Sequence, residues 1–265
     1  MNKCVLQLKE EKIDIKNWVP KNYIHAFLIV ESILLILSFI PFYYVLINII
    51  FWILSGIVMF FGILCINAYY QFGKDNNALQ KKIHDILLNN LPWNGEGKAL
   101  DIGTGNGAVV IKLAKNYPNC KAIGIDFWGK RWEYSKLDCE KNAKIEEIGE
   151  RIQFQKASAA NLPFENEEFD AVVSNFVFHE VIEVKNKREL IFEALRVLKK
   201  GGAFSFQDYF YSKNYYGRKD ELKSELIKSG LKEIHFKELK DSIEIPLLLR
   251  FGFFLGNMVN LYGIK

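Results

Sequence analysis

The stretch LDIGTGNG, residues 100–107, decides the fold of this chain. An apolar run ends there in three glycines, Gly103, Gly105 and Gly107, spaced G-x-G-x-G. A strand that ends in a glycine-rich turn before a helix is typical of nucleotide-binding α/β sheets, because the backbone can approach a ligand closely where no side chain intervenes. The dinucleotide fingerprint is G-x-G-x-x-G, so this spacing alone is weak evidence for the identity of the nucleotide.

Composition excludes several classes of protein. The chain has 265 residues, a formal net charge of +4 and 50% hydrophobic residues. That charge is too small for a nucleic-acid partner to be expected, because the lysines alternate with glutamates instead of clustering. No C-x-x-C pair occurs and no histidine lies at metal-ligand spacing, so neither disulfides nor a metal site is predicted and a reducing compartment is expected. The four cysteines are Cys4, Cys65, Cys120 and Cys139.

A long apolar block precedes the glycine turn. Residues 24–70 contain no Lys or Arg, and Glu31 is their only acidic residue. Residues 23–42 and 44–66 are each long enough to cross a bilayer, and Pro41 between them favours a turn. The block is too long and starts too late for a signal peptide. The pattern predicts a transmembrane helical hairpin, and the alternative is a pair of buried core helices.

Lysines flank both ends of the block, and the connecting turn has none. They are Lys3, Lys9, Lys12, Lys16 and Lys21 before it, and Lys74, Lys81 and Lys82 after it. Positive charge marks the cytoplasmic side of a membrane. We therefore predict a multi-pass membrane protein with a cytoplasmic N-terminal segment (1–22), a transmembrane hairpin (23–70) and a cytoplasmic domain (75–265).

Glu31 is unusual in such a block. A carboxylate in the middle of a membrane helix costs several kcal/mol, which indicates a functional or packing role. The alternative is a side chain that is protonated or that reaches the interface. Ser55 and Gly62 lie on one face of the second helix, where small residues let helices pack closely.

Strand and helix patterns alternate from Asp75 onward. Strands are expected at 98–103, 121–126, 151–157, 169–175, 203–208 and 233–239, and helices at 81–88, 108–115, 131–148, 187–198 and 219–229. The helix at 187–198 is expected to stop at Gly201 and Gly202. This alternation predicts a parallel sheet with helices on both faces and a ligand at the carboxyl ends of the strands.

Two carboxylates at strand ends indicate the cofactor. Asp101 lies two residues before Gly103, where it would repel a pyrophosphate and attract an ammonium and a sulfonium group. S-adenosylmethionine carries both of these cations and no phosphate. Asp126 ends the second strand, where a carboxylate can accept both ribose hydroxyls, as it does for NAD. Each residue alone is equally consistent with a turn or capping role, and together they predict S-adenosylmethionine.

Four ordered segments resemble the class I S-adenosylmethionine-dependent methyltransferases of small-molecule type. They are ALDIGTGNGAVVIKLAK, AIGIDFW, NLPFENEEFDAVVSNFVFHEV and ALRVLKKGGAFSFQDYF, and the resemblance covers residues 75–265. It implies an α/β fold with a Rossmann-like seven-stranded methyltransferase sheet, preceded here by the two transmembrane helices. The last, antiparallel strand is expected within residues 245–263.

The resemblance also implies the cofactor-binding residues. They are Asp101, Gly103, Thr104, Gly105, Gly107, Asp126, Phe127, Ser158, Ala159 and Asn175. Phe127 is expected to flank the adenine, and Ser174 and Asn175 to face the methionine end. Ser158 stands where many relatives have an acid that contacts the adenine amino group. A serine hydroxyl bonds that group more weakly than a carboxylate does, and the backbone of Ala159 is expected to contribute.

The reaction leaves fewer marks in the sequence. A methyltransferase mainly aligns its acceptor with the methyl group, and it needs a general base only where the acceptor must lose a proton. Residues 175–178 read N-F-V-F instead of the N-P-P-Y of nucleic-acid amino-methylases, and the segment resembles small-molecule and quinone C-methylating enzymes. His179 is the predicted catalytic base, with a structural role as the alternative. Asp208 ends the fifth strand at the same rim, and Tyr209 and Tyr211 beside it either border the acceptor pocket or pack in the core.

The combined prediction is a membrane-anchored methyltransferase with a small hydrophobic acceptor, such as a quinone precursor or a lipid headgroup. The apolar residues at 245–263 are also able to touch lipid. Two alternatives are an enzyme whose hairpin assembles with a membrane partner while its acceptor is soluble or a protein, and a non-catalytic methyltransferase-like binding module. No metal and no nucleic-acid partner is expected.

Overall fold

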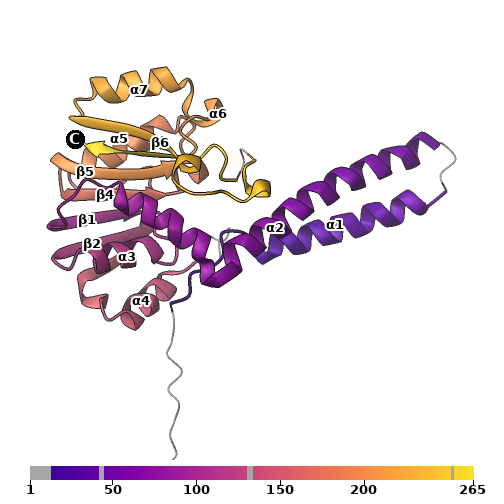
Figure 1. Ribbon diagram of the computed structural model, residues 1–265, viewed down its shortest axis with the longest axis horizontal. Helices are drawn as coiled ribbons and strands as arrows, with labels where there is room; N and C mark the ends of the chain where they lie inside the picture. The colour runs from indigo at the N-terminus through magenta and orange to yellow at the C-terminus, as the bar shows by residue number, and fades with distance from the viewer. Residues whose placement is uncertain (1–12, 42–44, 130–133, 252–253) are drawn as a thin grey trace, which may run out of the picture.

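The protein consists of an α/β domain from which a helical hairpin projects (Figure 1). The computed structural model describes residues 13–41, 45–129, 134–251 and 254–265. The hairpin contains α1 (Lys21–Phe39) and the first half of α2 (Val45–Asn89). The strands and the other helices of the described chain lie in the domain (Figure 1).

A seven-stranded sheet forms the centre of the domain, in the order β3-β2-β1-β4-β5-β7-β6. The strands are β1 (Gly97–Ile102), β2 (Cys120–Asp126), β3 (Ile152–Lys156), β4 (Phe169–Asn175), β5 (Leu198–Asp208), β6 (Glu233–Glu238) and β7 (Val259–Ile264). The first five strands are parallel to one another, and β7 is antiparallel to both β5 and β6. This topology confirms the predicted seven-stranded methyltransferase sheet.

Helices cover both faces of the sheet. They are α3 (Ala108–Asn116), α4 (Lys136–Ile145), α5 (Arg188–Val197), α6 (Lys213–Tyr216) and α7 (Lys219–Lys228), with short 3-10 turns at η1 (Gly149–Arg151), η2 (Phe178–Glu180), η3 (Leu239–Asp241) and η4 (Leu247–Leu249). One apolar cluster joins α5 and α7 to the sheet, and a second joins α3, α4 and the end of α2 to its other side. Burial of these amphipathic faces holds the helices against the strands.

The start of β5 differs from the prediction. The helix α5 ends at Val197 and the strand begins at once at Leu198, so the glycines at 201 and 202 lie within β5 and do not stop the helix. Leu198 pairs with Phe169 of β4. The N–H of Gly201 donates to the carbonyl of Lys265 at 2.7 Å, and the N–H of Lys265 donates to Gly202 at 2.9 Å. These backbone partners favour an extended conformation over a helical one.

Two other elements have boundaries that differ from the predicted ones. The helix predicted at 131–148 is α4, which begins after Ser135, whose hydroxyl accepts the N–H of Asp138 at 3.1 Å as an N-cap. Residues 130–133 lie outside the described part of the chain. Of the segment 245–263, only the last part enters the sheet as β7, while η4 packs against α2.

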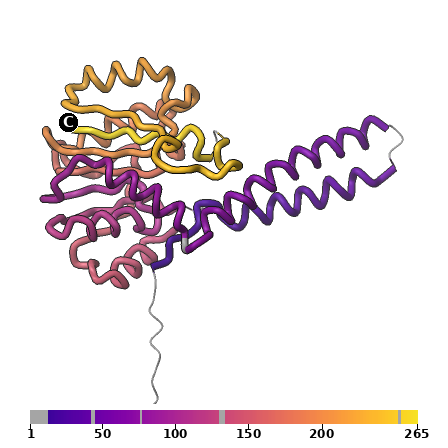
Figure 2. The backbone as a smooth tube through the Cα atoms, in the orientation of Figure 1, coloured from indigo at the N-terminus to yellow at the C-terminus, as the bar shows by residue number. Residues whose placement is uncertain are grey.

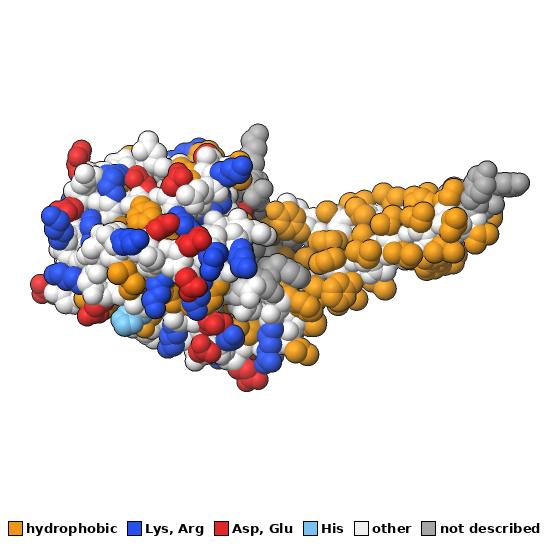
Figure 3. Space-filling view, turned by 90° about the horizontal axis from the view of Figure 1, so that it is seen from above, with side chains coloured by type: hydrophobic (Ala, Val, Ile, Leu, Met, Phe, Trp, Pro, Cys, Tyr) orange, Lys and Arg blue, Asp and Glu red, His pale blue; other side chains and the backbone are white. Residues whose placement is uncertain are grey.

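The hairpin has an apolar surface. Among the described residues, two helices are long and apolar enough to cross a membrane, judged by length and composition: α1 and the part of α2 at 45–75. Only 6% and 17% of their most apolar windows are buried inside the protein. Figure 3 shows the hairpin covered by apolar side chains, whereas the visible face of the domain carries mixed charges. Residues 42–44, which follow Pro41 in the predicted turn, lie outside the described residues.

Polar contacts join the two helices of the hairpin. Ser55 donates its hydroxyl to Oε1 of Glu31 at 2.7 Å, so the single acidic residue of the apolar block faces the other helix. Gly62 lies against Phe27, whose Cβ is 3.7 Å from the place where a Cβ of residue 62 would stand. Asn48 donates to the carbonyl of Ile40 at 2.7 Å and so binds the end of α1.

The helix α2 connects the hairpin directly to the core of the domain. It bends between the two parts (Figure 2), where Asp75 and Asn77 have positive φ angles of 51° and 61°. Beyond the bend, the carbonyl of Leu87 accepts the hydroxyl of Ser205 at 2.7 Å. The helix predicted at 81–88 is therefore the end of the same 45-residue helix that begins in the apolar block.

Residues 13–20, which we call the strap, connect the hairpin to the domain. Two hydrogen bonds join the strap to α2: Asn17 donates to the carbonyl of Tyr69 at 2.7 Å, and Gln80 donates to the carbonyl of Lys16 at 3.2 Å. Two contacts join it to α4: the N–H of Asp14 donates to Asn142 at 3.0 Å, and Lys16 pairs with Asp138 at 2.9 Å. The sequence indicated no structure for this segment. Because it is bonded at both ends, the strap fixes the base of the hairpin relative to the sheet.

Candidate active site

A cavity of about 920 Å³ lies at the carboxyl ends of the parallel strands. This is the edge where the sequence predicted a ligand, since both strand ends and helix N-termini meet there. Its walls come from the strap, the glycine turn, the ends of β2 and β4, η2 and the residues after β5. Such a volume is near the upper end of the ~300–1,000 Å³ usual for small-ligand sites, so it has room for two ligands side by side.

Most of the predicted site residues line this cavity. They are Gly103, Thr104, Gly105, Asp126, Phe127, Ser158, Ala159, Asn175 and His179. Asp101 and Gly107 belong to the same turn but do not line the cavity. Residues from four separate segments of the chain are thus brought together as predicted.

The glycine turn requires glycine for steric reasons. Gly103 has a φ angle of +73°, and a Cβ there would stand 2.1 Å from Cγ2 of Val177. The N–H groups of Gly103 and Thr104 both donate to the carbonyl of Ile125 at 2.8 Å, which joins the turn to β2. A side chain at position 103 would therefore be strained in its backbone and would also displace the segment after β4.

Asp101 stabilises the glycine turn through a hydrogen bond with Thr104. Its side chain is buried, and the hydroxyl of Thr104 donates to Oδ2 at 2.7 Å. Burial raises the pKa of Asp101 to about 7; the hydrogen bond from Thr104 lowers the pKa, and the negative charge of Asp126 raises it further. The sequence predicted direct attraction between Asp101 and a ligand; in the structure this carboxyl group is bonded to Thr104, which lines the cavity, while Asp101 itself does not.

Asp126 links the ends of β1 and β2. Its carboxylate accepts the N–H of Gly105 at 2.9 Å and the N–H of Trp128 at 2.7 Å, and the indole of Trp128 donates to the carbonyl of Gly105 at 2.8 Å. Burial raises the pKa of Asp126, and these backbone N–H groups oppose the rise. The carboxylate is thus fixed in position at the cavity wall. The contribution of Trp128 was not predicted, because it depends on a contact with Gly105, which lies in the turn after another strand.

The region expected to hold the adenine contains an unpredicted carboxylate. Phe127 is 57% exposed at the cavity edge, with Nζ of Lys156 lying 5.4 Å from its ring centre. The hydroxyl of Ser158 is 3.4 Å from Oε1 of Glu183, which also lines the cavity. Position 158 itself holds a serine, but the carboxylate of Glu183, from the loop after η2, lies beside it. Only the tertiary structure brings these two residues together.

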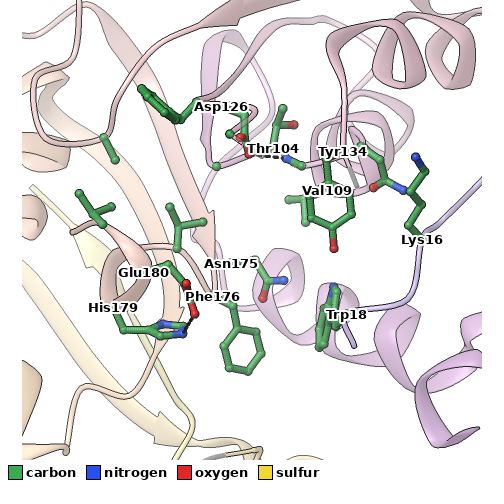
Figure 4. A pocket seen from close by; sticks show the side chains of 18 of the residues that line it. Lys16, Trp18, Thr104, Val109, Asp126, Tyr134, Asn175, Phe176, His179 and Glu180 are labelled. Atoms are coloured by element: carbon green, nitrogen blue, oxygen red, sulfur yellow. Dashed lines mark hydrogen bonds and ion pairs between the residues drawn. The ribbon is translucent and has the colours of Figure 1, made fainter. Parts of the chain in front are cut away.

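Asn175 presents a hydrogen-bond acceptor without a partner. Its Oδ1 is closed off from solvent and has no hydrogen-bond partner among the described residues. Figure 4 shows Asn175 and Phe176 between His179 on one side and Trp18 on the other. Buried polar groups are nearly always bonded, so this oxygen suits a ligand that brings an N–H donor such as an ammonium group. The cavity therefore fits the amino-acid end of S-adenosylmethionine.

His179 is held by a buried carboxylate. Its Nδ1 lies 2.9 Å from Oδ1 of Asp208, and its backbone N–H donates to Oδ2 at 3.2 Å. On the cavity side, Nε2 lies 3.4 Å from Oε1 of Glu180. Burial lowers the pKa of His179, but the charge and hydrogen bond of Asp208, with those of Glu180, outweigh burial and raise it to about 9. The ring is therefore mainly an imidazolium at neutral pH.

Aromatic rings surround His179. Its ring centre lies 4.8 Å from that of Tyr209, 5.8 Å from that of Tyr215 and 6.2 Å from that of Phe176. All three rings line the cavity. Tyr209 therefore borders the site, which is one of the two alternatives that the sequence left open. Tyr211 does not line the cavity; it stacks on Phe236 at 6.0 Å instead. Flat apolar walls of this kind suit a ring-shaped acceptor.

The strap closes the opposite side of the cavity. The indole of Trp18 packs on Phe72, His84 and Phe176, with ring centres 5.1, 5.6 and 5.2 Å apart. Burial, together with the nearby charge of Lys112, lowers the pKa of His84 to about 3, so this histidine is neutral. No local pattern indicated that Trp18, a residue so early in the chain, lines the site.

Comparisons with known proteins agree with this geometry. Residues 100–206 match the family model described as Methyltransferase domain. The chain is 35% identical over 138 residues to a ubiquinone/menaquinone biosynthesis C-methyltransferase of Geotalea daltonii, covering 52% of this chain and 54% of that protein. The chain spans about half the length or less of the curated relatives it matches first.

Solved structures share the fold at low sequence identity. The geranyl diphosphate C-methyltransferase of Streptomyces coelicolor A3(2) has a TM-score of 0.54 at 13% identity, covering 71% of this chain and 79% of that one. The [4+2]-cyclase SpnF has a TM-score of 0.53 at 17% identity, covering 71% and 81%. A methyltransferase and a cyclase on one fold illustrate that the fold alone does not decide the reaction.

The sheet topology, the glycine turn and the carboxylate at the end of β2 define an α/β protein that is built around a nucleoside. Taken with the family match over residues 100–206, they identify a class I S-adenosylmethionine-dependent methyltransferase domain in this chain. S-adenosylmethionine, the predicted cofactor, is the cofactor of this class.

Proposed function

We propose that the chain is a membrane-anchored methyltransferase that transfers a methyl group from S-adenosylmethionine to a small hydrophobic acceptor. The observation that carries the proposal is one cavity whose lining includes both a nucleoside-binding edge and His179, which is held by the buried Asp208. This cavity adjoins a hairpin with an exposed apolar surface.

Three side chains have positions suited to the cofactor. The carboxylate of Asp126 would accept the ribose hydroxyls, the ring of Phe127 would lie against the adenine, and Oδ1 of Asn175 would accept the ammonium group. When bound, S-adenosylmethionine supplies an electrophilic methyl group on a sulfonium sulfur, which keeps the electrons of the broken bond. The chain's contribution is to hold the acceptor atom in line with that methyl group and to exclude water.

His179 has the position to bind the acceptor. As an imidazolium it would donate from Nε2, in place of its contact with Glu180, to an oxygen of the acceptor and stabilise negative charge on that oxygen. An acceptor that binds as a phenolate or enolate passes electron density from this oxygen to the ring carbon beside the C–O carbon, and that carbon attacks the methyl group. The proton that the methylated carbon then loses would pass to the carboxylate of Glu180, which lines the cavity, or to solvent. The predicted role as a general base needs a neutral ring, and a pKa of about 9 leaves only a small neutral fraction at pH 7.

The hairpin supports a membrane location. Neither apolar helix is mostly buried in the protein, which argues against a pair of core helices. Leaving so much apolar surface in water would be costly, whereas a bilayer would cover it. The lysines on both flanks favour a cytoplasmic domain.

The acceptor class follows from the site together with the relatives. Apolar aromatic walls around one charged donor suit a ring that carries an oxygen substituent. The name of the Geotalea relative refers to quinone biosynthesis, and quinone precursors are rings of this kind with low solubility in water. We therefore propose a hydrophobic quinone precursor as the acceptor class.

Calorimetry with the full-length protein in detergent micelles tests cofactor binding. S-adenosylhomocysteine should bind to the wild-type chain, and the Asp126→Ala variant should bind it more weakly. Methyl transfer from labelled S-adenosylmethionine to a naphthoquinol that lacks its ring methyl group, supplied in vesicles, then tests the reaction. The absence of cofactor binding by the folded wild-type protein would overturn the proposal, and binding without any methyl transfer would favour the non-catalytic binding module.

A further inference from the structure

The cavity has a second end beyond the cofactor edge. Its lining continues from His179 and Phe176 past Trp18 to the base of the hairpin. The residues at this hairpin end are Val19, Pro20, Tyr23, Cys65, Phe72 and Leu255. The mechanism described above uses none of them. A ring-sized acceptor and the cofactor do not account for this extension.

The hairpin end lies within the segments that are able to cross a membrane. Tyr23 belongs to the first candidate span and Cys65 to the second, which covers residues 45–75. The neighbour of Cys65 on the helix, Ile66, is 45% exposed and faces outward. With the hairpin in a bilayer, the cavity would therefore reach the level of the lipid, while its cofactor end stays in the domain.

The walls at the two ends differ in chemistry. The cofactor and acceptor end carries Asp126, Glu180, Glu183 and His179. The hairpin end has aliphatic and aromatic walls and a thiol, and none of its six residues is charged. Lys16, which lines the cavity nearby, is paired with Asp138 at 2.9 Å. A hydrocarbon chain satisfies such a surface, and a charged or strongly polar group does not.

We propose that the hairpin end binds the hydrocarbon tail of the acceptor, and that the acceptor enters sideways from the membrane at the base of the hairpin. The inference rests on the proposed function, because it takes the reacting ring of the acceptor to lie beside His179. The tail then lies over Cys65 and Tyr23 and continues into the lipid. The strap and α2, bonded to both parts, hold this path in line with the reacting end.

A bulky residue at position 65 tests the tail site. The full-length protein is placed in vesicles of phosphatidylcholine and phosphatidylglycerol, as wild type, as Cys65→Trp and as the control Ile66→Trp, which adds the same ring on the lipid side. The probes are demethylated naphthoquinols without a tail and with a farnesyl tail. The quantity compared is kcat/KM for the farnesyl probe divided by kcat/KM for the tailless probe. Cys65→Trp should lower this ratio about tenfold, which is the loss expected when roughly two methylene groups are no longer buried. Ile66→Trp should not change the ratio. An unchanged ratio in Cys65→Trp would overturn the inference.

A binding measurement separates this inference from the proposed function. In a Cys4→Ser background, alkylation of Cys65 by N-phenylmaleimide is followed by mass spectrometry of the full-length protein; Cys120 and Cys139 are buried. Farnesyl naphthoquinone should slow this alkylation and its tailless counterpart should not, whether or not methyl transfer occurs. The matched control places the thiol on the lipid side, as Cys65→Ser with Ile66→Cys, and the farnesyl compound should not protect it. Equal protection at both positions, or none at Cys65, refutes the tail site even if the enzyme is active.

Discussion

The His179–Asp208 pair makes a prediction about pH that distinguishes two roles of the histidine. Substituting Asp208→Asn keeps the shape of the side chain and removes the charge that raises the pKa of His179. Burial lowers the pKa of His179, and without the charge of Asp208 less opposes this effect, so the pKa should fall well below about 9. At neutral pH the wild-type ring is an imidazolium, and the ring of the variant should be largely neutral.

The magnitude follows from the shift of the pKa. Raising the pKa of His179 from 6.5 to about 9 corresponds to about 3 kcal/mol in favour of the folded state. Because the pKa is raised on folding, this stabilisation is fully present below pH 6.5 and is lost as the pH rises through 9. In a domain of this size it amounts to roughly 6–12 °C in Tm.

Thermal melting of the detergent-solubilised protein, followed by tryptophan fluorescence, provides the assay. The Tm of the wild type should fall between pH 6.5 and 9.5, whereas that of Asp208→Asn should change little over the same range. His235→Gln is the control, because it removes an exposed histidine away from the site. This variant should keep the wild-type dependence of Tm on pH. A wild-type Tm that stays constant over this range, or a variant that keeps the wild-type slope, would refute the reasoning.

The same titration separates donor from base in catalysis. If the imidazolium donates to the acceptor, kcat/KM for the acceptor should fall as the pH rises above about 9. If His179 acts as the base predicted from the sequence, kcat/KM should rise through the same pH instead. The affinity for S-adenosylhomocysteine, measured in parallel, controls for effects on the cofactor.

Three further predictions concern the cofactor edge. Gly103→Ala should abolish S-adenosylhomocysteine binding and lower the Tm, since its Cβ would meet Val177 at 2.1 Å, whereas Gly56→Ala, with nothing within 4 Å, should leave both unchanged. Asp126→Ala should weaken that binding roughly 10- to 100-fold by calorimetry, the value of a hydrogen bond to a charged group; an unchanged affinity would exclude it as the ribose ligand. Glu183→Gln should weaken binding roughly threefold if this carboxylate replaces the acid missing at position 158, while full affinity in the variant would refute that role.

Much of the fold could be predicted because its signals are local. The apolar strands, the glycine turn and the helix periodicity each depend on near neighbours in the sequence, and the resemblance of the ordered motifs to the methyltransferases implied the topology of the sheet. The boundaries at 198–202 were wrong because the pairing of Leu198 with Phe169 and the backbone bonds to Lys265 overrode the local helix-stop pattern. Pairing between distant segments is not recorded in a local window.

The site divides in the same way. Residues at strand ends, such as Asp126, Asn175 and His179, could be predicted because parallel strands end at one edge of the sheet. The environment of each residue could not. Asp101 turned out to face Thr104, Glu183 came to lie beside Ser158, and Asp208 changed the expected charge of His179.

The sequence by itself determined that a class I methyltransferase domain follows a long apolar block, because glycine spacing, strand-end carboxylates and the absence of charge are properties of the chain. Only the tertiary structure decided how the two parts are joined. The continuous helix α2 and the strap bring residues 15–23 and Cys65 to the same cavity as Asp126 and His179. Contacts between segments so far apart exist only after the apolar faces have packed, which is why no pattern in the sequence recorded them.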